Sequence, residues 1–282
     1  MPDIIDFEAQ QVEKANASGL TPVVFIHGLW LLPSSWDRWR AVFEEAGYAT
    51  LGPGWPDDPD TVEDANKHPE VFARKSVGQI ADHIGDVIGK LTKKPALIGH
   101  SFGGMFTQIL AGRGAAAVSV AIDPAPFRGV LPLPFSALKA AWPVIGNPFN
   151  RGRAIPLTFG QFRFAFANAV TESEAHDLYV TFAVPGSGVP LFQAAAANLN
   201  PLTEAKVDTK NPDRGPLLII DGELDNTVPW TVARASFKRQ RRNPGVTEIA
   251  KIPGRGHSLT IDHGWREVAD TALAFVQKHA QP

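Results

Sequence analysis

A single hydroxyl stands between two glycines at a sharp change of pattern in this chain of 282 residues. Residues 96–106 read ALIGHSFGGMF: an apolar run breaks at Gly99, Ser101 follows two residues later, and a second apolar run begins after Gly103. Such a strand-to-helix turn needs neighbours without a Cβ and holds the serine hydroxyl in the open at a helix N-terminus, where developing negative charge is stabilised. Ser101 is therefore a candidate nucleophile; in the alternative interpretation it only caps the helix.

A serine hydroxyl is a poor nucleophile at neutral pH until a base removes its proton, and imidazole titrates in the right range. Of the eight histidines, His257 is the best placed, because it lies in the glycine-rich stretch PGRGHSL between the last predicted strand and the final predicted helix. His263 is its one credible rival. The chain contains no cysteine, which excludes a thiol nucleophile, disulfides and thiolate metal sites.

A carboxylate must orient the histidine, and two aspartates at predicted strand ends can do so. Asp225, in IIDGELDNTVPW, follows the strand predicted at 216–222 and is the preferred acid. Asp123, in AIDPAP, ends the strand predicted at 117–123 and is the alternative. Asp221 lies nearer its strand and is expected to brace the turn.

Acyl transfer also needs donors for the negative charge that develops on the former carbonyl oxygen. The stretch HGLW, residues 27–30, leaves the first clear strand with a glycine that allows close backbone approach. We assign the two donors of this oxyanion hole to the backbone N–H groups of Leu29 and Phe102, with that of Trp30 as the less favoured second donor.

These candidate groups follow short β-branched runs that alternate with longer amphipathic segments. The expected strands lie at 22–27, 49–53, 95–100, 117–123, 216–222 and 247–253, and the expected helices lie at 36–47, 77–91, 102–112, 230–242 and 264–280. Alternation of this kind implies right-handed crossovers and a parallel sheet with helices on both faces. The pattern therefore predicts an α/β fold with about six strands, whose carboxyl ends carry the candidate site.

The alternation stops once, from about Gly129 to Arg214, where the chain is rich in Pro, Phe and Ala and has no strand-like run. A stretch of this length is too long for a loop, so we predict a helical insertion over one end of the sheet. The predicted core domain comprises residues 1–129 and 214–282, and the predicted cap comprises residues 130–213. The lack of internal repeats and low-complexity linkers favours one domain with an embedded cap over two tandem domains.

The composition indicates a soluble globular protein, with 44% hydrophobic residues, 20% charged residues and a net charge of −2. Such a charge gives no field that would recruit nucleic acid or an anionic membrane. No apolar run approaches the ~18 residues that a membrane span needs, and residues 1–19 lack the pattern of a secretory signal. We expect a cytoplasmic protein, monomeric or homodimeric, with a small molecule as its substrate.

Two further patterns receive modest interpretations. No metal or cofactor is expected, because HSLTIDH at 257–263 lacks the helical i, i+4 histidine pair of a zincin, and serine chemistry needs no ion. The basic run KRQRR at 238–242 is expected to face water at a helix C-terminus rather than to bind an anionic partner.

Taken in order, HGLW, GHSFGG, GELDNTVP and GRGHSL resemble the motifs of the α/β-hydrolase superfamily, and the resemblance covers residues 20–280. It implies that Ser101, Asp225 and His257 form a catalytic triad and that the insertion is the cap of many members. Serine at the turn argues against haloalkane dehalogenases and epoxide hydrolases, which use aspartate there. Members commonly begin with a further pair of strands, for which the residues before Leu20 are too few and too polar, so we expect six strands, all parallel.

The residues and the resemblance together predict a serine hydrolase that cleaves a carboxylic ester, or a lactone, of a largely apolar small molecule through an acyl-enzyme. The substrate pocket is expected between sheet and cap, with Trp30, Trp142 and Phe135 as contacts. Hydrolysis of carbon–carbon bonds and perhydrolysis use the same framework and stay open as alternatives, as does a receptor-like protein with little turnover.

Overall fold

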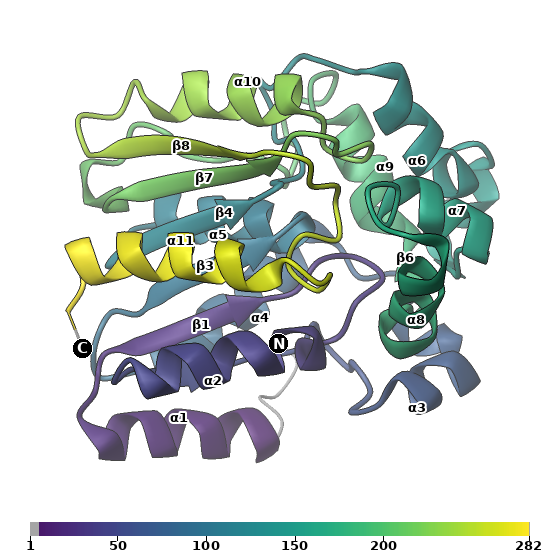
Figure 1. Ribbon diagram of the computed structural model, residues 1–282. Coiled ribbons are helices and arrows are strands. Elements are labelled where there is room, and N and C mark those ends of the chain that lie inside the picture. Colours follow the sequence, from purple (N-terminus) through teal and green to yellow (C-terminus); the bar gives the residue numbers. More distant parts are fainter. Residues whose placement is uncertain (1–5, 282) are drawn as a thin grey trace.

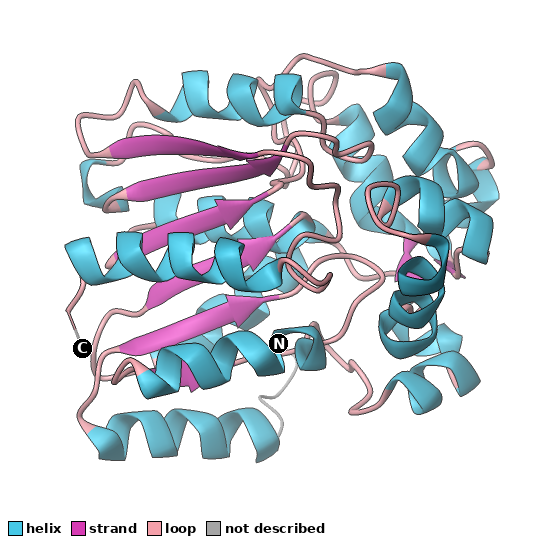
Figure 2. Cartoon of the chain, in the orientation of Figure 1, coloured by secondary structure: helices cyan, strands magenta, loops and turns pink. Residues whose placement is uncertain are grey.

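Six parallel strands form the centre of the molecule, for which a computed structural model describes residues 6–281 (Figures 1 and 2). The strands are β1 (Pro22–Ile26), β2 (Ala49–Leu51), β3 (Ala96–His100), β4 (Val118–Ile122), β7 (Leu217–Gly222) and β8 (Thr247–Ile252). Their order across the sheet is β2-β1-β3-β4-β7-β8, and every neighbouring pair is parallel. The predicted six-stranded parallel sheet is confirmed, with each strand inside its predicted run.

Helices cover both faces of the sheet because successive side chains of each strand point to opposite faces. Val23 and Phe25 of β1 belong to the apolar cluster that α2 and α11 cover, whereas Val24 and Ile26 belong to the cluster under α1, α4 and α5. The helices of the core are α1 (Asp6–Ser18), α2 (Asp37–Glu45), α3 (Val62–Lys67), α4 (Val77–Gly89), α5 (Phe102–Gly112), α10 (Trp230–Gln240) and α11 (Trp265–His279).

Helix α1 occupies the segment for which the sequence predicted no further strands. Val12 and Ala15, three residues apart, are buried against the core. Glu8 is buried too, and its Oε1 lies 3.0 Å from Nε2 of His83 on α4. A helix with so few apolar contacts gives a weak periodic signal, which is why the sequence did not predict it.

Along the chain, four helices and a short antiparallel pair of strands follow β4 and precede β7. They lie at the carboxyl ends of the sheet strands (Figure 1). They are α6 (Phe135–Ile145), α7 (Phe159–Ala165), α8 (Glu172–Phe182) and α9 (Gly188–Ala196), with β5 (Ala154–Ile155) and β6 (Gly186–Ser187). The two-residue strands were not predicted, since they are too short to produce an alternating pattern. Short 3₁₀ helices complete the described fold at Pro33–Trp36, Pro69–Phe72, Pro148–Gly152 and Pro212–Arg214.

The last part of the segment predicted as cap returns to the core. The backbone N–H of Arg128 donates to the carbonyl of Ala205 at 2.8 Å, and the side-chain amide of Asn211 donates to the carbonyl of Gly112, at the end of α5, at 2.9 Å. We keep the name cap segment for residues 130–213, with the boundary itself a prediction.

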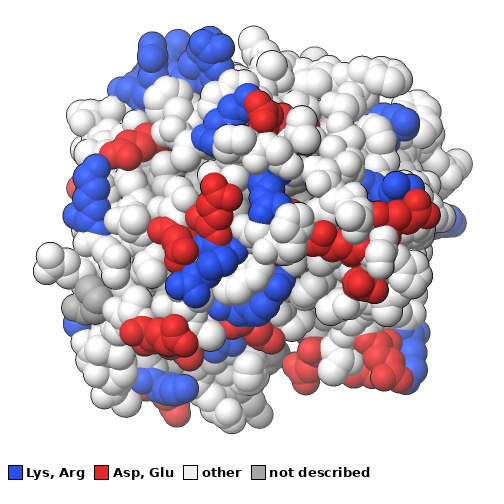
Figure 3. Space-filling view, viewed as in Figure 1, with Lys and Arg blue, Asp and Glu red and all other residues white. Residues whose placement is uncertain are grey.

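Charged side chains of both signs are interspersed over the face shown in Figure 3. Lys and Arg side chains gather near the C-terminal end of α10, where Lys238 and Arg239 lie in the last turn of the helix (Figure 3). Positive charge at this place complements the negative end of the helix dipole.

Within residues 6–281, no helix is both long enough and apolar enough to cross a membrane.

A buried arginine joins the end of the cap segment to the last strands. The fully buried guanidinium of Arg214 donates to the Val246 carbonyl at 2.8 Å, to Oγ1 of Thr247 at 3.0 Å and to Oε1 of Gln240 at 3.2 Å. Burial lowers the pKa of Arg214 to about 10. Carbonyl and amide oxygens thus replace the water that the cation loses on folding.

Replacing Arg214 by leucine removes these donors and leaves several buried oxygens unsatisfied. We expect Arg214→Leu to lower the free energy of unfolding by about 3 kcal/mol. Urea denaturation followed by circular dichroism measures this loss. Arg234→Leu, on the exposed side of α10, is the matched control and is expected to stay within about 0.5 kcal/mol of the parent; equal losses in the two variants would contradict the assigned role.

Candidate active site

Ser101 occupies the turn between β3 and α5 with a strained backbone. Its φ of 56° and ψ of −118° lie where residues with a Cβ are rarely found. A Cβ on Gly99 would lie 2.2 Å from the carbonyl oxygen of Gly103, and one on Gly103 would lie 2.0 Å from that of Ile26. Glycine is therefore required at both flanking positions, as the sequence predicted.

Neighbouring strands hold this turn in place. The N–H of Ser101 donates to the carbonyl of Ile122 at 2.9 Å, and the Ser101 carbonyl accepts from the N–H groups of Ala125 at 2.9 Å and Met105 at 3.1 Å. These bonds fix the strained conformation from β4 on one side and from α5 on the other. The hydroxyl is consequently presented at the carboxyl edge of the sheet.

A chain of two hydrogen bonds links the serine to a histidine and an aspartate. Nε2 of His257 lies 3.0 Å from Oγ of Ser101, and Nδ1 of His257 lies 2.6 Å from Oδ2 of Asp225. All three side chains are buried. In this arrangement the imidazole can take the hydroxyl proton while the carboxylate fixes its tautomer.

Both oxygens of Asp225, the preferred acid, face hydrogen-bonding partners. Oδ1 of Asp225 accepts from the backbone N–H groups of Thr227 at 2.6 Å and Val228 at 2.9 Å, and Oδ2 faces His257. The alternative acid, Asp123, lies farther from the histidine, with its Oδ2 3.7 Å from Nδ1 of His257. The rival base His263 is exposed and pairs with Glu174 at 2.8 Å.

The cap segment holds the loops that carry this histidine and this aspartate. Three successive carbonyls at the end of α7 accept hydrogen bonds from them: Phe164 from the Asn226 side chain at 3.0 Å, Ala165 from the Thr227 hydroxyl at 2.6 Å and Phe166 from the Ser258 N–H at 2.9 Å. The Phe166 ring also packs edge-on against the imidazole of His257. We call these three bonds the α7 clamp.

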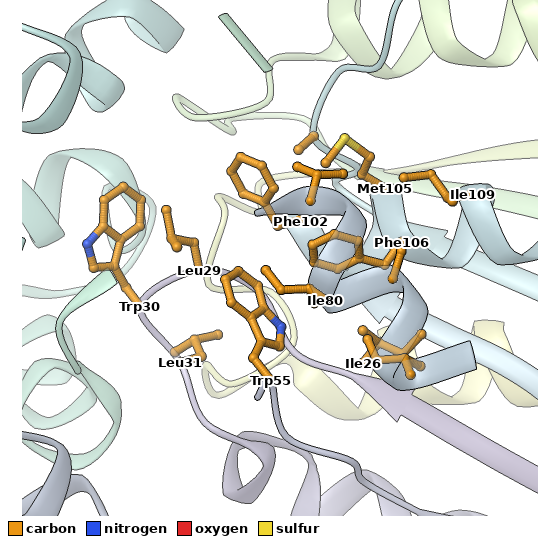
Figure 4. Packing of buried hydrophobic residues seen from close by; sticks show 14 of the residues in the cluster. Ile26, Leu29, Trp30, Leu31, Trp55, Ile80, Phe102, Met105, Phe106 and Ile109 are labelled. Atoms are coloured by element: carbon orange, nitrogen blue, oxygen red, sulfur yellow. The ribbon is translucent and has the colours of Figure 1, made fainter. Parts of the chain in front are cut away.

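The predicted oxyanion donors lie on two segments that meet beside Ser101. Leu29, in the loop after β1, and Phe102, at the start of α5, bring their side chains into the same apolar cluster (Figure 4). Among residues 6–281, the backbone N–H groups of Leu29 and Phe102 have no internal acceptor. A Cβ on Gly28 would lie 2.9 Å from Cβ of Ser101, which shows how closely the loop approaches the turn.

His27 fixes the orientation of this loop. Its Nδ1 donates to the Gly28 carbonyl at 2.9 Å, its Nε2 lies 2.9 Å from Oδ2 of Asp58, and its ring stacks on that of Trp55. The carbonyl of Gly28 and the N–H of Leu29 belong to one trans peptide and point in opposite directions. Anchoring the carbonyl therefore directs the Leu29 N–H away from His27.

An apolar cavity of about 170 Å³ opens above Ser101, between the sheet and the cap segment. It is lined from the core by Trp30, Phe102 and Phe127, and from the cap segment by aliphatic side chains of α6 and α9 that include Ala137, Leu138, Ala141, Leu191, Ala194 and Ala195. Within this lining the polar side chains are Ser101, Asn198 and Thr227. A cavity thus lies where the sequence analysis predicted the substrate pocket, and its use by a substrate stays a prediction.

Of the three predicted substrate contacts, Trp30 lies in the lining and the other two do not. Phe135 and Trp142 are 80% and 64% exposed and lie outside the cavity. Helix α6 presents its alanines and Leu138 to the cavity instead, and aromatic content alone does not reveal which stripe of a helix faces inward. Phe135 and Trp142 are therefore not part of the proposed pocket.

A model of the alpha/beta hydrolase family matches residues 23–271. The chain belongs to the alpha/beta hydrolase family. This hydrolase matches no curated protein in a sequence search, but solved structures share its fold.

Three examples follow, each with a TM-score of 0.63. A monoacylglycerol lipase of Paleococcus ferrophilus is 20% identical, over 92% of this chain and 95% of its own. A pyrethroid hydrolase from Sphingobium faniae is 19% identical, over 93% and 99%, and a polyneuridine aldehyde esterase variant is 17% identical, over 90% and 98%. At this identity the likeness establishes the fold of the hydrolase.

His100 is a site residue whose role the sequence analysis missed. It is fully buried, and its Nε2 donates to the backbone carbonyl of His257 at 2.9 Å. Burial, together with the neighbouring His257, lowers the pKa of His100 well below its ordinary value, so the ring is neutral. Its position at the strand end, directly before Ser101, was the available signal.

Asp221 also belongs to the site, whereas the sequence analysis expected it only to brace the turn. Its carboxyl, and those of Asp123 and Asp225, approach within 4.8 Å of one another at the ends of β4 and β7. Burial raises the pKa of Asp221 to about 8, and burial next to Asp225 and Asp221 raises the pKa of Asp123 well above its ordinary value. This group of three carboxyls has the spacing of a metal site, and so does the group of His100, Asp123 and His257. In the second group, both ring nitrogens of His257 already face Ser101 and Asp225.

The backbone strain at Ser101 can be measured as a difference in the free energy of unfolding between two variants. Alanine keeps the Cβ in the left-handed conformation, whereas glycine adopts it freely. We expect Ser101→Gly to be more stable than Ser101→Ala by about 1 kcal/mol, although both lack the hydroxyl. Urea denaturation of the two variants tests this; an Ala variant as stable as the Gly variant would contradict strain at this position.

The raised pKa of Asp221 makes the stability of the hydrolase depend on pH. Folded Asp221 keeps its proton up to about pH 8, whereas the unfolded residue loses it near pH 4. The stabilising contribution is complete below about pH 4 and is lost as the pH rises through about 8. The free energy of unfolding of Asp221→Asn, relative to that of the parent, should therefore increase from pH 5 to pH 8. Urea denaturation of both proteins at each pH measures this difference. The exposed Asp60→Asn variant should show no such trend.

Proposed function

We propose that this alpha/beta hydrolase cleaves carboxylic esters, lactones included, through an acyl-enzyme formed on Ser101. The observation that carries the proposal is the buried hydrogen-bond chain from Asp225 through His257 to Ser101, with distances of 2.6 and 3.0 Å. As Oγ of Ser101 attacks the ester carbonyl, Nε2 of His257 accepts the hydroxyl proton, and the Asp225 carboxylate stabilises the imidazolium. His257 then gives this proton to the departing alkoxide, and the acyl group stays on Ser101.

Water completes the cycle by the same route. Nε2 of His257 removes a proton from a water molecule, the hydroxide attacks the acyl carbon, and the proton returns to Oγ of Ser101 as the carboxylic acid departs. In both steps negative charge develops on the former carbonyl oxygen. The N–H groups of Leu29 and Phe102, which have no other acceptor within residues 6–281, are the proposed donors to it.

The proposed substrate is a largely apolar small molecule. Apart from three polar side chains, the cavity wall is aliphatic or aromatic, and its volume of about 170 Å³ is comparable with the roughly 150 Å³ of an apolar cavity that holds benzene. We propose that the cap segment supplies the roof of this pocket. The lipase and esterase named among the structural neighbours support ester chemistry.

Labelling with a fluorophosphonate tests the nucleophile. We expect a covalent adduct on Ser101, located by mass spectrometry, and hydrolysis of p-nitrophenyl butyrate by the parent protein. Both should disappear in Ser101→Ala and fall by at least about 10³-fold in His257→Ala, because the base is lost. The exposed Ser173→Ala variant is the control. A folded protein that neither reacts nor turns over would favour a receptor-like role and overturn the proposal.

The alanines of α9 test the pocket. Ala195 lines the cavity and its neighbour Ala196 does not, although both are exposed. Ala195→Phe should lower kcat/KM for p-nitrophenyl octanoate by about 10-fold or more, because the ring narrows the cavity, and should change that for the acetate far less. Ala196→Phe should leave the chain-length profile as in the parent. Identical profiles in all three proteins would place the substrate elsewhere.

A further inference from the structure

Asp123 is a buried carboxyl group that the proposed reaction does not use, although it faces the proposed base. Its Oδ2 lies 3.7 Å from Nδ1 of His257, against 2.6 Å for Oδ2 of Asp225. Asp123 follows β4 with a φ of 41°, a conformation that an aspartate rarely adopts. Its Oδ1 accepts from the N–H of Gly222 at 2.8 Å, which fixes the carboxyl in this position.

As an ionised group, Asp123 would lack a donor for its second oxygen. Oδ2 of Asp123 and both oxygens of Asp221 are buried without a hydrogen-bond donor. The two carboxyl groups lie within 4.8 Å of each other and of Asp225, and three buried carboxylates at such distances cannot all carry charge. Protons on Asp221 and Asp123 remove two of the charges and supply the missing hydrogen bond between them.

Few other titratable groups face this pair. Asp225 and His257 face the pair from the direction of Ser101. Nε2 of His100 is 4.0 Å from Oδ2 of Asp123, but it already donates to the His257 carbonyl. From β8, Lys251 acts on Asp221 through its charge while pairing with Glu223 at the surface. Asp225, with two backbone donors and the imidazole, is the member of the trio best able to hold the charge.

We propose that Asp123 is a reserve acid for His257: it stays protonated against Asp221 while Asp225 is ionised, and it ionises and orients His257 when Asp225 is removed. The inference rests on the proposed serine mechanism. On loss of Asp225, one proton leaves Asp123 for solvent, Asp221 keeps its proton and donates to the new carboxylate, and Oδ2 of Asp123 accepts from Nδ1–H of His257. Asp123 acts only through His257, so it is a positioning residue.

A double-mutant cycle tests the proposed role of Asp123 as a reserve acid. The rate of fluorophosphonate labelling at Ser101 is measured for the parent, Asp225→Ala, Asp123→Asn and the double variant. Alanine is used at 225 because an asparagine amide would impose the wrong imidazole tautomer. We expect Asp225→Ala to lose about 10²-fold and the double variant about 10⁴-fold, so that removing Asp123 costs far more when Asp225 is absent than when it is present.

The pH profile separates this role from a structural one. Residual labelling of Asp225→Ala should rise with pH as Asp123 loses its proton, and the pH profile of the double variant should lack this component. Equal losses on removing Asp123 in both backgrounds, or pH profiles of the same shape, would overturn the inference. An unlabelled parent would instead refute the proposed function, so the two failures are distinguishable. Asp213→Asn, exposed and distant in sequence, is the control.

Infrared spectroscopy gives a readout that does not need turnover or a stable Asp225 variant. The parent at pH 7 should show the C=O stretch of protonated carboxyl groups, and the difference spectra against Asp123→Asn and against Asp221→Asn should each contain this band. Difference spectra that contain only carboxylate bands would mean that Asp123 and Asp221 are ionised, and the reserve-acid inference would be wrong.

Discussion

The strained turn at Ser101 is the constraint on which the rest of the site depends. A residue with a Cβ is held at a φ of 56°, and this is sterically permitted only because Gly99 and Gly103 let β3, α5 and the end of β1 approach to backbone contact. The same approach brings the loop after β1 beside Ser101, so that one set of glycines positions the hydroxyl and both proposed oxyanion donors.

The three carboxyl groups of the buried site differ in their hydrogen-bond donors, and the proposed reserve role of Asp123 depends on this difference. Both oxygens of Asp225 face donors, whereas Oδ2 of Asp123 and both oxygens of Asp221 have none. Burial raises the pKa of Asp123 and of Asp221, and the three side chains differ in where the backbone N–H groups around them point. A neutral His100 beside His257 adds no competing positive charge.

The sequence predicted the sheet and the proximity of Ser101, Asp225 and His257, because apolar β-branched runs identify buried strands and the carboxyl ends of parallel strands converge on one edge. It did not predict helix α1, whose few apolar contacts give little periodicity, or the two-residue strands β5 and β6. Nor could it orient α6: the alanines that line the cavity carry no signal, and the aromatic residues that attract notice point to solvent. Pairing of Asp123 with Asp221 depends on distances between strands that no local pattern contains.

The α7 clamp ties the cap segment to the chemistry rather than leaving it as an independent lid. The last carbonyls of a helix have no partner within it, and here those of Phe164, Ala165 and Phe166 are satisfied by the loops that carry the acid and the base. A cap that swung away as one body would release the very loops that align Asp225 and His257. Under the proposed mechanism α7 therefore has to stay in place during turnover, and a cap transplanted from another hydrolase would have to reproduce this one turn of helix to keep those loops aligned.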